Sequence, residues 1–235
     1  MDSRGKCNYW IQMNAPKAVN CELTTLLSVT WCLTQGSVVP ISYKRHVGSN
    51  CMIRNFQVRQ EEALNLTITE AMLATLASPP LFASTSVFKD ASTFEYISAD
   101  LTLSNPTRQI IVEAYGTFGE EARVACLLSL GCGHPGIAPS PDDSEMTSWI
   151  QFLTRIVMDS ERKAQDIDGQ MGHLGLYYRF CVPQGLEQES PSLKPEGILA
   201  HTVVYLSSAP VSSKITECTD SIKLRDGLAS LEQLS

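Results

Sequence analysis

The sequence lacks several patterns by which protein chemistry is most often recognised. Its eight cysteines form no CxxC pair, and its four histidines include no HExxH motif and no pair at metal-ligand spacing. We therefore expect no metal site and no bound cofactor. Cysteines inside apolar runs, such as Cys126 and Cys181, are typical of buried free thiols in a reducing compartment, which favours a cytoplasmic location.

Long apolar runs and basic clusters are also missing. No stretch approaches the ~18–20 apolar residues that a transmembrane helix needs. The net charge is −7 over 235 residues, and the Lys and Arg residues form no cluster. This balance argues against nucleic acid as a partner and against long-range attraction to anionic membranes. The apolar run Leu23–Leu33 could be mistaken for the apolar region of a signal peptide. We predict a core strand or helix instead, because threonines and a serine interrupt the run and it lies far from Met1.

The remaining composition is that of a globular protein. Hydrophobic residues make up 43% of the chain and charged residues 18%, and 235 residues suit one α/β domain. Residues 1–60 carry the weakest signals and are taken as the N-terminal segment of the same domain as residues 61–235. Strands are predicted at Cys7–Met13 and Val38–Tyr43, and Pro40 favours a sheet edge for the second.

One helix has a clear beginning in the sequence. Thr67 and Glu70 have the spacing of a capping box, in which a hydroxyl and a carboxylate satisfy each other's backbone amides. Apolar residues then recur at a spacing of four, and Pro79 follows. The pattern predicts a helix over Thr69–Ala77 that ends before the proline.

A strand, a helix and a second strand are predicted next. Phe94–Ile97 is the first strand. Asn105 is expected to cap a helix over Pro106–Phe118, and Gly119 is expected to end it. Val124–Leu130 is a continuous apolar run, as in a buried parallel strand. This order predicts a βαβ unit and an α/β fold with a mostly parallel sheet.

The C-terminal half predicts further elements. Apolar spacing indicates an amphipathic helix at Met146–Val157, and the polar segment Asp159–Gly172 is expected to be exposed. Leu176–Val182 is predicted to be a strand. Two helices are expected near Glu196–Leu206 and Val211–Leu224.

A glycine-rich loop follows the predicted strand Val124–Leu130. Gly131–Gly136 matches GxGxxG, but Pro135 prevents a helix from beginning at the third glycine, and a dinucleotide site needs that helix. The loop is therefore predicted to be a tight glycine turn. His134 within it is expected to be a solvated loop histidine.

The sequence has no GxSxG nucleophile motif and no glycine-rich oxyanion loop, and both are needed by a serine hydrolase of the α/β type. Asp100 stands between a predicted strand and a capped helix. Two interpretations are open: a turn aspartate that binds local backbone, or a carboxylate at the sheet edge where α/β proteins place function.

Several segments, in order, resemble the patatin-like lipid acyl hydrolases of the fungal type. The family's Ala-Thr-Ser-Ala-Ala-Pro, Asp-Gly-Gly-Leu-Gly-x-Asn-Asn-Pro and Val-Ser-Ile-Gly-Thr-Gly have counterparts here. So do its Tyr-Tyr-Arg-Phe-Asn-Val-Pro-x-Gly-Leu and its tail. The resemblance covers about residues 65–225, and the counterparts are Leu73–Pro79, Ser98–Pro106, Leu128–Gly133, Tyr177–Leu186 and Ala200–Leu206.

The resemblance implies a partial three-layer α/β/α sandwich with a mostly parallel sheet. It also implies a Ser–Asp dyad that hydrolyses phospholipid or lysophospholipid acyl esters. The family's serine lies in GxSxG, upstream of every matched segment, and Ser98 stands where the family has its aspartate. Asp100 is then the one catalytic candidate.

A chain with these departures is expected to be a truncated or inactive copy of the hydrolase. The alternative is a non-catalytic module that keeps the fold and binds lipid or a partner protein. Self-association and transient contact with membranes are expected of either form.

Overall fold

The computed structural model divides the chain into two compact units. Unit 1 comprises residues 1–14, 105–139 and 159–235, and unit 2 comprises residues 15–104 and 140–158. The described residues are 8–13 (backbone only), 38–54, 56, 58, 64, 66–79, 82–89, 91–100, 102–133, 140–142, 145–157, 159–183, 195–224 and 227–234. Leu23–Leu33 and His134 lie outside them. The boundary expected at residue 60 stays a prediction.

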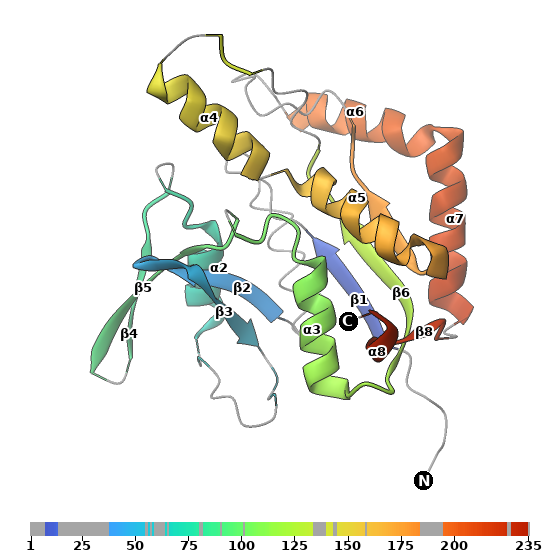
Figure 1. The fold of residues 1–235 in the computed structure, drawn as a ribbon, viewed down its shortest axis with the longest axis horizontal. Coiled ribbons are helices and arrows are strands. Elements are labelled where there is room, and N and C mark those ends of the chain that lie inside the picture. The colour runs from blue at the N-terminus through green and yellow to red at the C-terminus, as the bar shows by residue number, and fades with distance from the viewer. Residues whose placement is uncertain are drawn as a thin grey trace. The chain divides into compact units, whose positions relative to one another are not determined.

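The sheet of unit 1 is built around one buried strand, β6 (Arg123–Leu130). Strand β1 (Asn8–Met13) and strand β7 (Tyr177–Phe180) flank β6 and run parallel to it, and the short β8 (Ala229–Ser230) pairs antiparallel with its beginning (Figure 1). The predicted inner parallel strand at Val124–Leu130 is confirmed. Its continuous apolar sequence reflects burial on both faces of the sheet.

Helices cover both faces of this sheet. Successive strand residues point to opposite faces, so Leu127 and Tyr177 face one way, and Cys126 and Tyr178 the other. The first pair packs with α3 (Thr107–Phe118) and α5 (Ser160–Met171). The second pair packs with Cys218 of α7 (Ala209–Leu224). Helix α6 (Pro195–Ser207) precedes α7, and η1 (Gly172–Leu174) and α8 (Leu231–Leu234) complete the unit.

Helix α5 forms most of the segment Asp159–Gly172, whose predicted exposure is confirmed for half of its residues but not for its buried apolar ones. Asp159 caps the helix, because its carboxylate accepts hydrogen bonds from the amides of Glu161 and Arg162, both at 3.0 Å. The helix buries only Ala164, Ile167 and Met171 among its twelve residues. Three apolar residues in a polar stretch make a stripe too sparse to recognise by periodicity.

Unit 2 contains an antiparallel sheet with strand order β3-β2-β5-β4. Its strands are β2 (Val38–Tyr43), β3 (His46–Arg54), β4 (Thr85–Lys89) and β5 (Ser92–Ser98). Helix α2 (Ile68–Leu76) packs on this sheet and buries Ala74 against Ile41 and Tyr96. Helix α4 (Met146–Val157) belongs to the same unit and confirms the predicted amphipathic helix.

The predicted βαβ unit is wrong, although the α/β class is confirmed. Strand β5 contains the expected Phe94–Ile97, but it pairs antiparallel with β2 and β4 and not with β6. A tight turn at Ala91, whose φ is 60°, joins β4 to β5 as a hairpin. The described strands thus form two separate sheets rather than one mostly parallel sheet. The turn was missed because it lacks the Asn-Gly or Asp-Gly pair that usually marks a hairpin.

Predictions from short-range sequence patterns were more accurate within unit 2. Thr67 and Glu70 form both hydrogen bonds of the capping box, as predicted. Strand β2 has the predicted bounds but is not an edge strand, because β3 and β5 flank it. Pro40 is tolerated because β5 pairs only with Ile41–Tyr43, so no strand lies beside Pro40 on that side.

The core of unit 1 makes a stability prediction. Leu176 is fully buried among α5, β6 and β7, whereas Leu199 on α6 is 64% exposed. We expect Leu176→Ala to lower the free energy of unfolding by about 2–5 kcal/mol through lost contacts and a cavity. The matched Leu199→Ala should change it by less than about 0.5 kcal/mol. Urea denaturation followed by far-UV circular dichroism measures both, and equal effects would contradict this core.

Candidate functional site

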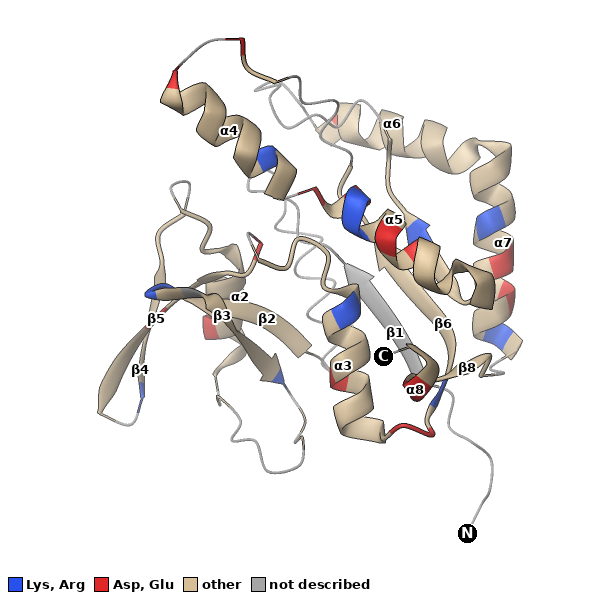
Figure 2. Ribbon diagram, in the orientation of Figure 1, with Lys and Arg blue, Asp and Glu red and all other residues tan. Residues whose placement is uncertain are grey.

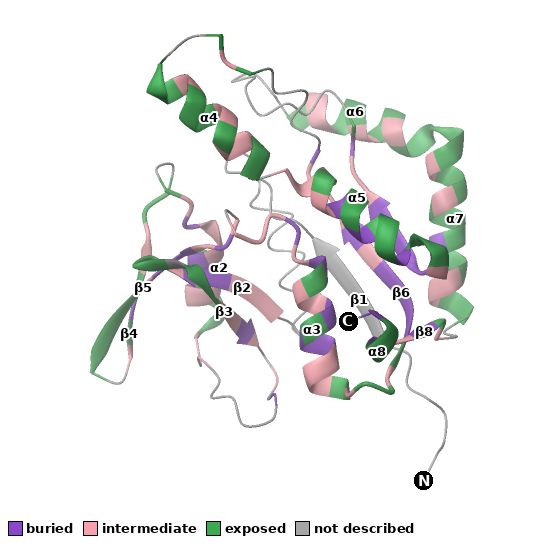
Figure 3. Ribbon diagram, in the orientation of Figure 1, coloured by how far each residue is buried: buried purple, intermediate pink, exposed green. Residues whose placement is uncertain are grey.

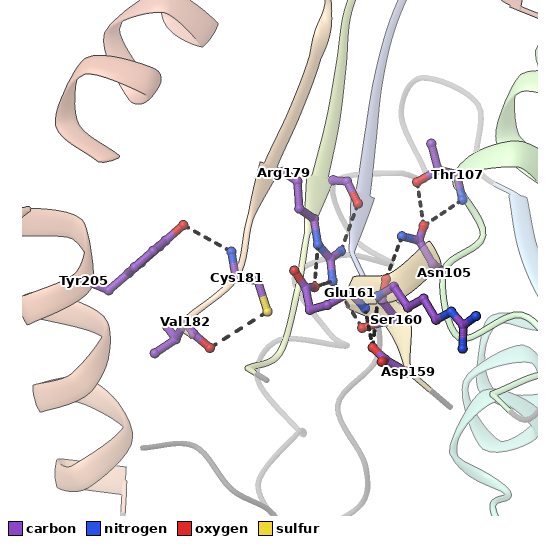
Figure 4. A network of polar contacts seen from close by, with 11 residues as sticks. Asn105, Thr107, Asp159, Ser160, Glu161, Arg179, Cys181, Val182 and Tyr205 are labelled. Carbon is purple, nitrogen blue, oxygen red and sulfur yellow. Dashed lines mark hydrogen bonds and ion pairs between the residues drawn. The ribbon is translucent and has the colours of Figure 1, made fainter. Parts of the chain in front are cut away.

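A cluster of polar side chains lies at the carboxyl ends of β6 and β7, on the face covered by α3 and α5 (Figure 4). Its centre is Arg179, which is only 9% exposed. We call this cluster the Arg179 centre. The side chains around the guanidinium are Ser129, Ser160 and Glu161.

Each nitrogen of the Arg179 guanidinium contacts an oxygen inside unit 1. Its Nε donates to Glu161 Oε1 at 2.9 Å, and Nη2 forms an ion pair with the same oxygen. Nη1 donates to Ser129 Oγ at 2.9 Å, and Nη2 also donates to Ser160 Oγ at 3.2 Å. A buried charge is tolerated only when it is paired and hydrogen-bonded. These contacts meet that condition and join β6, β7 and α5.

Asn105 connects the beginning of α3 to the same place. Its Nδ2 donates to the carbonyl of Ser160 at 3.2 Å, while its Oδ1 accepts from the amide and the hydroxyl of Thr107 at 3.2 and 2.6 Å. Asn105 thus bonds the first turn as expected, but the helix begins at Thr107 and Pro106 is its N-cap. The prediction was one residue early.

Tyr177 brings a buried hydroxyl to the Arg179 centre. The residue is 6% exposed, and its hydroxyl has no hydrogen-bond partner within the described residues. Burial raises the pKa of this phenol, and the nearby Ser129 hydroxyl and Arg179 charge only partly oppose the rise. Tyr177 is therefore neutral at physiological pH and is not a base.

The glycine loop after β6 has a structural reason. A Cβ at Gly131 would lie 2.5 Å from Cys181 Sγ and 2.6 Å from Arg179 Nη2, so no side chain fits there. Gly133 has a φ of 110°, which favours glycine. The two described glycines of this loop, Gly131 and Gly133, therefore satisfy packing and backbone needs without a phosphate ligand.

Cys181 beside this loop is not an activated nucleophile. Burial, and then the charge of Glu161, raise the pKa of its thiol to about 12. The thiol form therefore dominates at neutral pH, whereas reactive cysteines are thiolates in electropositive surroundings. Its backbone amide donates to the hydroxyl of Tyr205 on α6 at 3.2 Å, which ties α6 to the end of β7.

Asp100, the predicted catalytic residue, lies in unit 2 just after β5. Its Oδ2 accepts a hydrogen bond from Ser78 Oγ at 2.7 Å, and its amide donates to Ser98 Oγ at 3.2 Å. The amide of Ser98 in turn donates to the carbonyl of Ala77 at 2.8 Å. The Ser78–Asp100 and Ser98–Ala77 hydrogen bonds thus connect the end of α2 to the end of β5 and the turn after it. Sequence reasoning missed Ser78, since nothing local pairs it with a residue 22 positions away.

A serine that donates to an aspartate has the composition of a Ser–Asp dyad, but the surroundings do not suit catalysis. In α/β hydrolases the amide of the residue after the serine helps to hold the oxyanion. Here that residue is Pro79, which has no N–H. The Ser78–Asp100 pair is better explained as a tether, which favours the turn-aspartate interpretation.

Helix α4 presents an apolar surface. None of its residues is buried, and six of its large apolar side chains are between 38% and 72% exposed, whereas Phe152 is partly buried (Figure 3). Arg155 is its only ionisable residue, so Lys and Arg colour only a short part of it (Figure 2). Trp149 and Phe152 stack edge to face at 5.8 Å. The exposed residues form one stripe by helical spacing: Met146, Trp149, Ile150, Leu153, Ile156 and Val157.

In the described part of the chain, no three His, Cys, Asp or Glu side chains gather where they could hold a metal ion. None of the described helices is both long enough and apolar enough to span a membrane.

The contacts of the Arg179 centre lead to a prediction about the stability of unit 1. Glu161→Gln removes the charge that balances a buried guanidinium, so it should destabilise unit 1 by about 3 kcal/mol. Glu217→Gln, on the exposed side of α7, should change stability by less than about 0.5 kcal/mol. Urea denaturation compares the two variants. If Glu161→Gln unfolds at the wild-type midpoint, Arg179 does not depend on this carboxylate.

Comparison with known proteins leaves the chain without an assigned family. No protein-family model, no curated protein and no solved structure matches it. The patatin-like resemblance therefore stays a prediction that depends on the ordered segments in the sequence.

Proposed function

We propose that the chain is a patatin-like α/β module that binds lipid through α4 and does not hydrolyse acyl esters. The observation that carries the proposal is the apolar stripe on α4. This choice favours the non-catalytic alternative over the hydrolase. Membrane contact is then transient, through a helix that lies at the lipid surface.

The arrangement of unit 1 supports the patatin-like part of the proposal. Parallel strands β1, β6 and β7 carry helices on both faces, as in one half of a three-layer α/β/α sandwich. Strand β7 (Tyr177–Phe180) is the beginning of the resembling segment Tyr177–Leu186. It contributes buried side chains to both faces of the sheet. The antiparallel sheet of unit 2 would be a departure from the family's single sheet.

The two site geometries support the absence of hydrolysis. Pro79 denies an oxyanion amide to the Ser78–Asp100 pair, and the raised pKa of Cys181 keeps its thiol protonated. The donors of Arg179 are directed at protein oxygens, so this cation is not presented to a substrate. Ser78, Cys181 and Arg179 are thus each committed to structure.

The composition of α4 supports lipid over other ligands. Its stripe combines an indole with aliphatic side chains, a mixture suited to the boundary between headgroups and acyl chains. Only Arg155 is charged on the helix, and the whole chain is acidic at −7. Attraction to anionic lipid is therefore weak. The lipid surface that suits this helix is electrically neutral, as phosphatidylcholine is.

The first test concerns turnover. Purified chain should hydrolyse a p-nitrophenyl acyl ester and phosphatidylcholine no faster than buffer, because loss of a hydrolase nucleophile costs on the order of 10⁶ in kcat. Ser78→Ala and Asp100→Asn should leave that background unchanged. Turnover that either substitution abolishes would mean that Ser78 and Asp100 form a working dyad.

The second test concerns lipid binding by α4. Wild-type chain should float with neutral phosphatidylcholine vesicles, and Ile150→Glu or Leu153→Glu should lower its partition at least about tenfold. Removing an apolar side chain from lipid costs about 1.5–3 kcal/mol of binding free energy. Each 1.4 kcal/mol changes the partition constant by a factor of about ten.

The matched control for this test is Thr147→Glu, which adds the same charge at an exposed polar position of α4. It should keep wild-type partition. Failure of the wild-type chain to float would overturn the lipid proposal. If α4 substitutions instead dissolved a self-associated form seen by light scattering, the stripe would be a protein interface.

A further inference from the structure

Two buried cysteines face each other between the sheet and a helix of unit 1. Cys126 lies on β6 and Cys218 on α7, and their Sγ atoms are 3.8 Å apart. The residues are 2% and 5% exposed, and both thiols are free. They are 92 positions apart in the sequence. No function described above uses this pair.

Helix α7 is held on the sheet by a narrow strip of contacts. Cys218 is its one buried residue among sixteen, and Ile222 packs beside it. Ser221 Oγ lies 2.9 Å from the hydroxyl of Tyr178, and Lys214 Nζ lies 5.8 Å from the ring centroid of Phe180. A helix with so little buried surface opens locally at low free energy. Local opening gives small solutes access to the two sulfurs.

The two sulfurs are not equivalent. The hydrogen bond from Cys126 lowers the pKa of Cys218, and the positive charge of Lys214 one turn earlier adds to this effect against the cost of burial. The same hydrogen bond, together with burial, raises the pKa of Cys126. The lowered pKa and the nearby charge of Lys214 thus favour Cys218 as the sulfur that ionises first.

We propose that Cys126 and Cys218 form a redox-active dithiol, which a peroxide oxidises to a disulfide that joins β6 to α7. The thiolate of Cys218 attacks one peroxide oxygen, the O–O bond breaks, and Cys218 becomes a sulfenic acid as hydroxide or an alkoxide leaves and takes a proton from solvent to give water or an alcohol. The sulfur of Cys126 then attacks the sulfenic sulfur. The S–S bond forms, the S–O bond breaks, and the hydroxide leaves as water with the thiol proton of Cys126. The peroxide is reduced by two electrons and the dithiol is oxidised by two.

The geometry leaves little movement to this step. The sulfurs stand at 3.8 Å, and a disulfide needs about 2.0 Å, so an approach of about 1.8 Å suffices. The bond would close a loop of about ninety residues and restrict the unfolded chain strongly. Oxidation therefore fixes α7 to the sheet, and reduction restores the local opening of the helix. This inference does not depend on the lipid-binding proposal.

The experiment treats the purified, reduced full chain with hydrogen peroxide at neutral pH. Peptide mapping by mass spectrometry should find Cys126 joined to Cys218, and dithiothreitol should reverse the link. The oxidised chain should unfold at a temperature at least about 5 °C higher. Amide hydrogen exchange in α7 should slow after oxidation. A peptide map without this link in the folded, peroxide-treated chain would overturn the proposal.

Single substitutions test which of the two sulfurs attacks the peroxide. In Cys126→Ser, dimedone should trap a sulfenic acid on Cys218, whereas Cys218→Ser should give no adduct on Cys126. The reverse pattern would overturn the assignment of Cys218 as the attacking thiolate. Cys132→Ser, in the loop after β6, is the matched control and should form the link as the wild type does. Circular dichroism checks that each variant is folded. If a variant is unfolded, the peptide map of the peroxide-treated wild-type chain decides the proposal.

Discussion

The buried charge of Arg179 is the constraint on which unit 1 depends. An arginine inside a sheet core needs a counter-charge and hydrogen-bond acceptors close by, and Glu161, Ser129 and Ser160 supply them. These partners come from α5 and β6. The chain must therefore bring the capped beginning of α5 to the carboxyl end of β7, and Gly131 must stay without a side chain to make room. One charge thus determines how several elements meet.

The chain uses two kinds of sheet for two kinds of task. Strands β6 and β7 of unit 1 bury apolar residues on both faces and place polar groups at their carboxyl ends. The antiparallel sheet of unit 2 pairs through short turns, and its polar tether at Ser78 and Asp100 holds a helix to a strand. Ser78, Asp100 and Arg179 suggest catalysis by their identity but serve structure, because each is bonded to a neighbour within its own unit.

Much of the fold could be predicted where the signal is local. The capping box at Thr67, the strand Val124–Leu130 and the helix at Met146–Val157 each depend on residues close in sequence. Strand pairing could not be predicted, because the Phe94–Ile97 segment has the same propensity for a parallel or an antiparallel neighbour. Asp100 was recognised as a polar turn residue, but its partner Ser78 and the whole Arg179 centre come from residues far apart in the chain.

The sequence by itself determined the class of the fold, the positions of most helices and strands, and the absence of a GxSxG nucleophile motif, because these follow from residue identity and short-range periodicity. Only the tertiary structure decided which strands pair, which cation is buried with which anion, and that Cys126 lies against Cys218. Such contacts depend on long-range packing. Side chains 18 to 92 positions apart meet there for reasons that no local pattern records.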